Sequence, residues 1–284
     1  SIDNSANYDY SVATLAVNTT SSSIIDRCYV SGSIYVSTTG ILKSNYVAGL
    51  VVNHYGTIKN CYSIATLTAT SKYLGNSGEI RTAGIATNIF DGALIENCYF
   101  AGNAKVQYGY WKVGGIVGKP AGGTINNCAV LTGTCNQAGN TKNNFINQQR
   151  DSIDATVTNC LVVEASALQS NSSAPLSSWD FSDNSTDRYW GYPSSDSEYY
   201  NSGYPALRNH YESFTVSFYS EDGGTLLSSQ TTGYPYYSVQ YPAAQSKRGY
   251  TFNGWSRSSN STGTVSGYGG TLSNVFQSAN FYAH

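Results

Sequence analysis

The sequence predicts an all-β chain, in which a right-handed parallel β-helix of about five coils is followed by a smaller β module. Three observations carry this prediction. Cysteines recur at near-equal steps, similar residues surround each of them, and only 11% of the residues are charged. An average globular domain has about 25% charged residues, and the β-branched and aromatic residues that are abundant here favour strands.

The cysteines mark a repeat. The steps between Cys28, Cys61, Cys98, Cys128 and Cys160 are 33, 37, 30 and 32 residues, and Cys135 falls outside the series. Near-equal steps of about 20–50 residues are typical of repeat architectures. A short repeat unit cannot enclose a core alone, so successive units must stack.

Two further positions keep a fixed distance from each cysteine. Three residues before it stands Ile or Val: Ile25, Ile58, Ile95, Ile125 and Val157. The residue directly before it is Asn60, Asn97, Asn127 or Asn159, with Arg27 in the first repeat. Asparagine tolerates the left-handed backbone of a sharp bend. We therefore expect a two-strand corner with an internal ladder of asparagines.

Two other short segments in each repeat look like strands. An apolar run precedes the cysteine at residues 48–51, 83–86 and 114–117, and another segment follows it, for example at residues 102–106. The sequence thus predicts three strands per coil, separated by glycine and polar turns.

The cysteines are expected to form a stack of small buried residues. The alternative is a metal or redox array, but there is no Cys-x-x-Cys pair and no Cys/His cluster. One disulfide could form, most plausibly between Cys128 or Cys135 and a neighbour. We expect no metal and no cofactor.

The tyrosines that follow three of the cysteines are candidate ligand-binding residues. If the cysteines point inward, Tyr29, Tyr62 and Tyr99 should point outward and stack, and an exposed aromatic ladder can pack on sugars or on a protein. The alternative is that they only stabilise the sheet. A second aromatic cluster, Tyr108, Tyr110 and Trp111, precedes the fourth cysteine.

Nothing in the sequence assembles a catalytic site. Asp26, Lys59 and Glu96 share one position of the repeat with alternating sign, which predicts a solvated face with pairing between coils. The histidines, His54, His210 and His284, are scattered. A formal net charge of −2 gives no basic field for nucleic acid, and no segment is apolar enough to insert into a membrane. We expect a non-enzyme.

The repeats resemble the GLUG-motif repeats of bacterial surface proteins. Residues 114–118 (Gly-Gly-Ile-Val-Gly) and 123–128 (Gly-Thr-Ile-Asn-Asn-Cys) carry the resemblance best, which extends over about residues 10–168. Residues 178–181 (Ser-Trp-Asp-Phe) and 204–208 (Tyr-Pro-Ala-Leu-Arg) are similar to the ending that follows such repeats. The predicted domains are accordingly a solenoid at 1–168 and a C-terminal cap at 169–211.

Residues 212–284 resemble a Listeria–Bacteroides repeat. Gly-Tyr-Thr-Phe-Asn-Gly-Trp at 249–255 is the most specific motif, and the resemblance implies a β-grasp-like spacer module. Together the two resemblances imply a monomeric fragment of a secreted or wall-attached bacterial adhesin with a host protein or glycan ligand. The alternatives are a carbohydrate-binding solenoid beside a separate catalytic domain and, third, a β-helix polysaccharide lyase or glycosidase.

Overall fold

The chain forms two compact units, residues 1–181 and 182–284, which are described separately. The computed structural model describes residues 2–4, 10–38, 44–71, 79–107, 110–137, 140–142, 145–146, 154–181, 189–193, 202–208, 213–233, 238–259, 269–272, 275 and 278–284.

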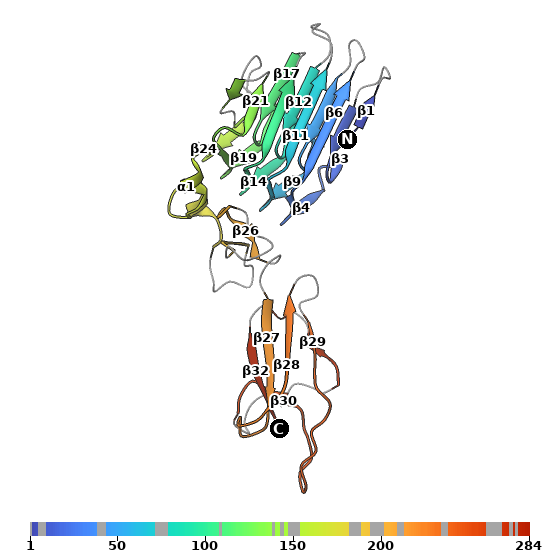
Figure 1. Cartoon of the computed structure of the whole chain (residues 1–284), viewed down its shortest axis with the longest axis vertical. Helices are drawn as coiled ribbons and strands as arrows, with labels where there is room; N and C mark the ends of the chain where they lie inside the picture. Colours follow the sequence, from blue (N-terminus) through green and yellow to red (C-terminus); the bar gives the residue numbers. More distant parts are fainter. Residues whose placement is uncertain are drawn as a thin grey trace. The chain divides into compact units, whose positions relative to one another are not determined.

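The first unit is a parallel β-solenoid with five short strands in each coil (Figure 1). The first coil contains β2 (Tyr10–Ala13), β3 (Ala16–Asn18), β4 (Ile24–Asp26), β5 (Tyr29–Val30) and β6 (Ser33–Thr38). The second contains β7 (Asn45–Ala48), β8 (Val51–His54), β9 (Thr57–Lys59), β10 (Tyr62–Ser63) and β11 (Thr66–Ser71). The third contains β12 (Glu79–Ala83), β13 (Ala86–Phe90), β14 (Leu94–Glu96), β15 (Tyr99–Phe100) and β16 (Asn103–Gln107). The fourth contains β17 (Tyr110–Gly114), β18 (Val117–Ala121), β19 (Thr124–Asn126), β20 (Ala129–Leu131) and β21 (Cys135–Gln137).

Equivalent strands of successive coils pair in parallel and form five sheets. Partial coils add β1 (Ile2–Asn4) beside β6, and β23 (Thr156–Thr158) and β24 (Leu161–Val163) beside β19 and β20. The short strand β22 (Asn140–Lys142) pairs with β21 in the antiparallel sense. The parallel β-helix is confirmed, with four complete coils among the described residues where the sequence predicted about five.

The register confirms the repeat position of Ile and Val. Ile25, Ile58, Ile95, Ile125 and Val157 occupy one column of paired residues. The four isoleucines are buried, whereas Val157 on the last strand of its sheet is 40% exposed. A continuous apolar column through stacked coils is the interaction that a single coil cannot make.

The prediction of three strands per coil is wrong. The apolar run before the cysteine bends into two strands, and the corner at the asparagine and cysteine separates two more. The bend falls at Gly49, Gly84 and Gly115, one in each of three successive coils. A Cβ atom on Gly84 would lie 2.2 Å from the carbonyl oxygen of Gly115 and 2.3 Å from the ring of Phe100. The bend therefore lies so close to the backbone of the next coil and to the Phe100 ring that only glycine fits. We call these three glycines the constriction.

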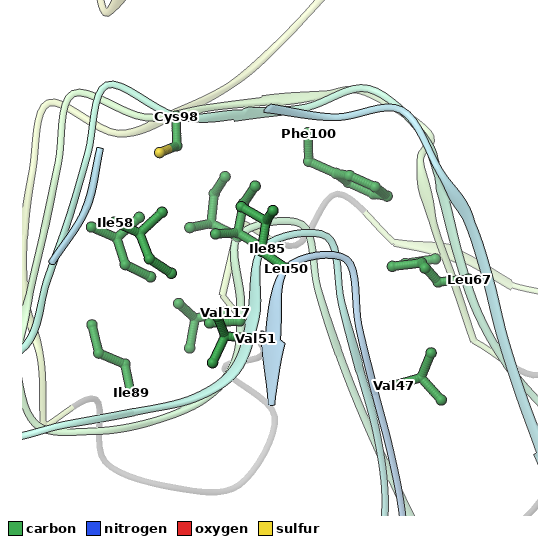
Figure 2. Packing of buried hydrophobic residues seen from close by; sticks show 14 of the residues in the cluster. Val47, Leu50, Val51, Ile58, Leu67, Ile85, Ile89, Cys98, Phe100 and Val117 are labelled. Atoms are coloured by element: carbon green, nitrogen blue, oxygen red, sulfur yellow. The ribbon is translucent and has the colours of Figure 1, made fainter. Parts of the chain in front are cut away.

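The hydrophobic core lies on both sides of the constriction. Figure 2 shows Ile58, Ile89 and Cys98 in one lobe, and Val47 and Leu67 facing each other in the other. All five side chains are fully buried. Cys135, which does not follow the cysteine spacing, pairs in register with Ala104 and is also buried.

A short helical segment follows the last described strand of the solenoid. It contains α1 (Ala165–Leu168) and the 3-10 helix η1 (Leu176–Ser178). Leu168 and Leu176 are buried, and so is Trp179 directly after η1. No helix among the described residues has the length and apolar character needed to cross a membrane.

The second unit holds a small β module. Its main sheet has the order β28 (Leu226–Gly233), β27 (Ser213–Tyr219), β32 (Ala279–Ala283) and β30 (Trp255–Ser256), with β27 and β32 parallel and the other neighbours antiparallel. Two antiparallel pairs accompany it: β25 (Trp190–Gly191) with β26 (Ala206–Leu207), and β29 (Val239–Gln240) with β31 (Thr271–Leu272). Phe218, Trp255 and Phe281 form the centre of its core. The predicted small β module after the solenoid is thus confirmed.

Candidate functional site

The residue before each repeat cysteine adopts the left-handed conformation that the sequence predicted. Its φ angle is 51° at Asn60, 50° at Asn97, and 49° at Asn127 and Asn159. Arg27, which replaces asparagine in the first coil, has φ 54°. Asparagine is enriched at such angles because its short amide can bond to nearby groups. The five residues turn the chain between the strand that carries the Ile or Val column and the strand that follows the cysteine.

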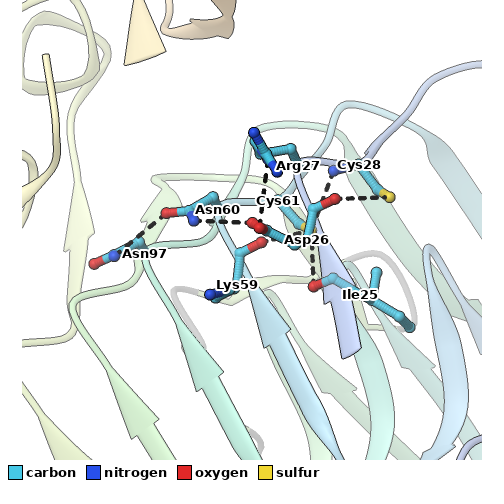
Figure 3. Close-up of polar contacts among 8 residues, drawn as sticks. All are labelled: Ile25, Asp26, Arg27, Cys28, Lys59, Asn60, Cys61 and Asn97. Atoms are coloured by element: carbon cyan, nitrogen blue, oxygen red, sulfur yellow. Dashed lines mark hydrogen bonds and ion pairs between the residues drawn. The ribbon is translucent and has the colours of Figure 1, made fainter. Parts of the chain in front are cut away.

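The amides of these asparagines bond from coil to coil. Asn97 Nδ2 donates to Asn60 Oδ1 at 3.4 Å, and Asn60 Nδ2 donates to Asp26 Oδ1 at 3.0 Å (Figure 3). Asn159 Nδ2 donates to Asn127 Oδ1 at 2.7 Å. The ladder is interrupted in the middle, where the buried Asn97 Oδ1 has no hydrogen-bond partner among the described residues. It is also less internal than predicted, since only Asn60 is fully buried.

The cysteine side chains form a column of thiols inside the same corner. Cys61, Cys98 and Cys128 are buried, and Cys28 and Cys160 at the two ends are half-buried. The thiols of Cys61, Cys98 and Cys128 donate to the backbone carbonyl two residues earlier at 3.0–3.1 Å. All six cysteines are free, so the disulfide considered for Cys128 or Cys135 is absent.

The thiols of the column differ in pKa. Burial and the neighbouring thiols raise the pKa of the Cys98 thiol well above its ordinary value. Burial also acts to raise the pKa of Cys61 and Cys128, but hydrogen bonds from neighbouring thiols outweigh it and lower both values. Among the described residues there is no group of three or more His, Cys, Asp or Glu side chains that could hold a metal ion. The burial of Cys61, Cys98 and Cys128 and their bonds to backbone carbonyls fit the predicted stack of small buried residues.

The tyrosines after the cysteines stack as predicted. Tyr29 and Tyr62 have ring centroids 5.2 Å apart, and Tyr62 and Tyr99 have centroids 5.0 Å apart with ring planes within 3° of parallel. Their exposure was predicted wrongly. Tyr62 is 3% exposed, Tyr99 is fully buried and Tyr29 is half-buried. Burial accordingly raises the pKa of the Tyr62 hydroxyl.

Trp179 covers the end of the column at Tyr99. In the fourth coil the register places Ala129, not a tyrosine, beside Tyr99. The ring of Trp179 lies 6.2 Å from the ring of Tyr99, and its Nε1 donates to the backbone carbonyl of Asn127 at 2.9 Å. A residue from the segment after the solenoid thus continues the aromatic column. The sequence analysis placed residues 178–181 in a predicted cap, but no repeat position indicated that Trp179 would stack on Tyr99.

The second aromatic cluster lies largely outside the described residues. Tyr108 is outside them altogether, and so are the side chains of Tyr110 and Trp111. The backbone of the latter two belongs to β17, where the register aligns Trp111 with Ile80 of β12. Their predicted role in ligand binding stays a prediction.

A second asparagine ladder, which the sequence analysis missed, connects the first three coils. Asn53 Nδ2 donates to Asn18 Oδ1 at 2.8 Å, and Asn88 Nδ2 donates to Asn53 Oδ1 at 2.6 Å. Arg81 Nη1 donates to Asn88 Oδ1 at 2.5 Å. Because Arg81 and Asn88 lie on either side of the bend at Gly84, this ladder joins the two strands that the bend separates.

An ion-pair cluster continues from Arg81. Its guanidinium pairs with Glu79, and Lys112 Nζ of the next coil lies 3.2 Å from the second oxygen of the same carboxylate. Burial by itself raises the pKa of the Glu79 carboxyl, but the hydrogen bonds and charges of Arg81 and Lys112 hold it below its ordinary value. Glu79 pairs with a cation of its own coil and with a cation of the next one, so the cluster joins coils three and four.

The charged stripe of the sequence analysis is half-exposed, as its position predicted. Asp26, Lys59 and Glu96 are paired in register on three successive coils. Within the described residues, however, no ion pair joins Lys59 to either carboxylate. Asp26 instead lies 3.4 Å from Arg27 and accepts the hydrogen bond of Asn60. The predicted pairing between coils is therefore made by Asn60.

His54 is held inside the solenoid by two hydrogen bonds. Its Nε2 lies 3.2 Å from the carbonyl oxygen of Leu94, and its Nδ1 lies 3.1 Å from Thr19 Oγ1. Because a carbonyl can only accept, the proton is on Nε2, and Nδ1 accepts from the hydroxyl. Burial lowers the pKa of the imidazole below its ordinary value of 6.5, although the backbone hydrogen bonds oppose this. His210 lies outside the described residues.

Acidification is expected to destabilise the solenoid through His54. A lowered folded-state pKa means that the unfolded chain binds a proton more readily, so stability is lost as the pH falls below about 6.5. Urea unfolding at about pH 7.5 and about pH 5.5, above the range of the carboxylates, measures the loss. The His54→Gln variant is the control and should lose stability less steeply. An equal pH dependence in both proteins would show that His54 is not the group responsible.

The first unit is a repeat protein of the parallel β-solenoid class, and a solenoid followed by a small β module fits a surface-associated repeat protein. The family model of the Listeria–Bacteroides repeat domain matches residues 214–284. This match supports the resemblance that the motif at 249–255 suggested. No curated protein and no solved structure matches the chain significantly.

Proposed function

We propose that this chain is a non-catalytic part of a bacterial cell-surface adhesin. In this proposal the solenoid, with GLUG-type repeats, is a rigid scaffold, and the C-terminal module is attached to it as a spacer. The outer surface presents a binding face to a host protein or a glycan. Listeria–Bacteroides repeats are typical of surface or secreted proteins, and the match over residues 214–284 supports an extracellular location.

One observation carries the proposal: the distinctive side chains of the repeat contact the adjacent coils. The asparagines bond along the axis, the thiols of Cys128 and Cys160 contact carbonyls of the preceding coils, and the tyrosines stack on one another. Repeats that use their characteristic residues for stacking build an extended scaffold, and such scaffolds bind through their outer surfaces.

Three buried or half-buried ionisable groups of the solenoid, which a catalyst could use, are engaged in structural pairs. Asp26 contacts Arg27 and Asn60, Glu79 contacts Arg81 and Lys112, and His54 bonds to Thr19 and to a carbonyl. A general acid or base has to reach a substrate with its proton-carrying atom. These contacts favour the scaffold over the third alternative, a polysaccharide lyase or glycosidase.

Adhesion of coated beads to cells tests the proposal. Fluorescent beads that carry the chain should adhere to host epithelial cells more than beads that carry albumin. The same preparation should release neither unsaturated sugars nor new reducing ends from a panel of polysaccharides. Adhesion no better than albumin would contradict the adhesin, and release of sugar products would establish the enzyme.

A further inference from the structure

The C-terminal module contains a cleft that the proposed spacer role does not use. The turn after β27, the loop at residues 245–252 and the end of β32 enclose a cavity of about 450 Å³. Leu227, Lys247, Tyr250 and Phe252 are among the residues that line it. Cavities of about 300–1,000 Å³ with a mainly apolar lining and a few polar groups are typical of small-molecule sites.

An aromatic ring is presented to solvent in this cleft. Tyr250 is 68% exposed, compared with 44% for Tyr35 on the solenoid. Leu227 beside the cavity is 40% exposed. The position of Phe252 is fixed by packing, since its ring lies edge-on against the ring of Trp255 with centroids 5.5 Å apart. The cleft thus combines a fixed apolar floor with a solvent-facing ring, which is the arrangement that packs against flat apolar faces.

The charged groups of the cleft already have polar partners. Lys247 Nζ lies 3.0 Å from Glu221 Oε2 and 4.3 Å from the centroid of the Tyr250 ring. One oxygen of Asp222 accepts from the hydroxyl of Ser220 and from the amide of Gly224. An ionic ligand would have to compete with these contacts.

Three further polar side chains of the lining are uncharged. They are the hydroxyls of Ser246 and Thr251 and the amide of Gln245, whose Nε2 donates to the carbonyl of Ala243 and leaves Oε1 as an acceptor. His284 also lines the cavity, and its Nε2 lies 2.9 Å from the carbonyl oxygen of Ser258. Hydroxyl and amide groups can both donate and accept. A ligand that matches them is uncharged, rich in hydroxyls and apolar on one face.

We propose that this cleft binds an uncharged pyranose unit of a glycan, with the sugar face against Tyr250 and its hydroxyls bonded to Gln245, Ser246 and Thr251. The inference rests on the proposed function, because it names the ligand class that the surface protein would recognise. It also assigns sugar recognition to the C-terminal module, in addition to its proposed role as a spacer.

A glycan array probed with the full chain tests the cleft. Uncharged hexopyranosyl oligosaccharides should bind, and sialylated or sulfated glycans should bind more weakly. Tyr250→Ala should weaken binding about tenfold or more, since a stacked aromatic contact contributes at this scale. Tyr250→Phe should retain most of it. Tyr35→Ala is the matched control, because it removes another exposed tyrosine, on β6 of the solenoid, and should change nothing.

Three outcomes would overturn the inference: binding unchanged in Tyr250→Ala, binding restricted to charged glycans, or binding of an unglycosylated peptide in place of sugars. Circular dichroism of Tyr250→Ala shows whether the variant is folded. The bead assay separates the two proposals. Adhesion without any glycan binding would overturn the cleft and leave the adhesin standing, whereas the absence of both would overturn both.

Discussion

Replacing Gly84 with alanine is expected to unfold the third coil and to lower the stability of the solenoid by about 3 kcal/mol or more, the upper end of overpacking effects. The added Cβ would lie 2.2 Å from the carbonyl oxygen of Gly115 and 2.3 Å from the ring of Phe100. Neither neighbour is the free end of a flexible side chain: one is backbone of the next coil, and Phe100 is fully buried. The two lobes of the coil would therefore have to move apart at the constriction.

Urea unfolding followed by circular dichroism measures this effect. Gly270→Ala is the matched control, because a Cβ at Gly270 meets nothing within 4 Å, and its midpoint should stay close to that of the unchanged protein. If Gly84→Ala unfolded at the same urea concentration as Gly270→Ala, the close approach at the constriction would be refuted.

Trp179→Ala is expected to cost about 3–5 kcal/mol, as large-to-small changes of buried aromatic residues do. The ring is 5% exposed, stacks on Tyr99 and donates a hydrogen bond to Asn127. Its loss would expose Tyr99, which no repeat residue can cover because the next coil has Ala129 at that position. The aromatic column would then end at an uncovered ring.

Trp179→Phe separates stacking from the hydrogen bond. It keeps a ring against Tyr99 and removes the Nε1 donor, so we expect a smaller loss, with about 0.5–1.5 kcal/mol from the hydrogen bond. Leu226→Ala, at a side chain that is 53% exposed in the second unit, serves as the neutral reference in the same urea titration. A Trp179→Ala variant as stable as this reference would mean that the segment after the solenoid does not cover the column.

Features that depend on one repeat position could be predicted from the sequence, because stacking places equivalent residues side by side. The isoleucine column, the left-handed asparagines and the stacked tyrosines follow in this way. A cap that contains Trp179 was predicted, but its stacking on Tyr99 could not be, because Trp179 belongs to a segment without a repeat. Its contact with Tyr99 forms only when the segment after the solenoid packs against the third coil.

Three other features were not predicted, for different physical reasons. The five-strand coil was missed because a glycine within a short apolar run signals close backbone approach but not a division into two strands. The second ladder was missed because Asn18, Asn53 and Asn88 stand ten, eight and ten residues before the cysteines of their coils. The turn in between varies in length and hides the match. The cleft gave no sequence signal, because its carboxylate, Glu221, lies on a different loop from Lys247 and Tyr250.

The reactivity of the thiols tests the central claim, which is that the repeat cysteines mark the inside of the coils. Cys61, Cys98, Cys128 and Cys135 are buried, and Cys28 and Cys160 are half-buried. With Ellman's reagent and no reductant, we expect all six thiols to react in denaturant and at most two to react promptly in the native protein. Prompt reaction of four or more native thiols, or fewer than six in denaturant, would contradict the account.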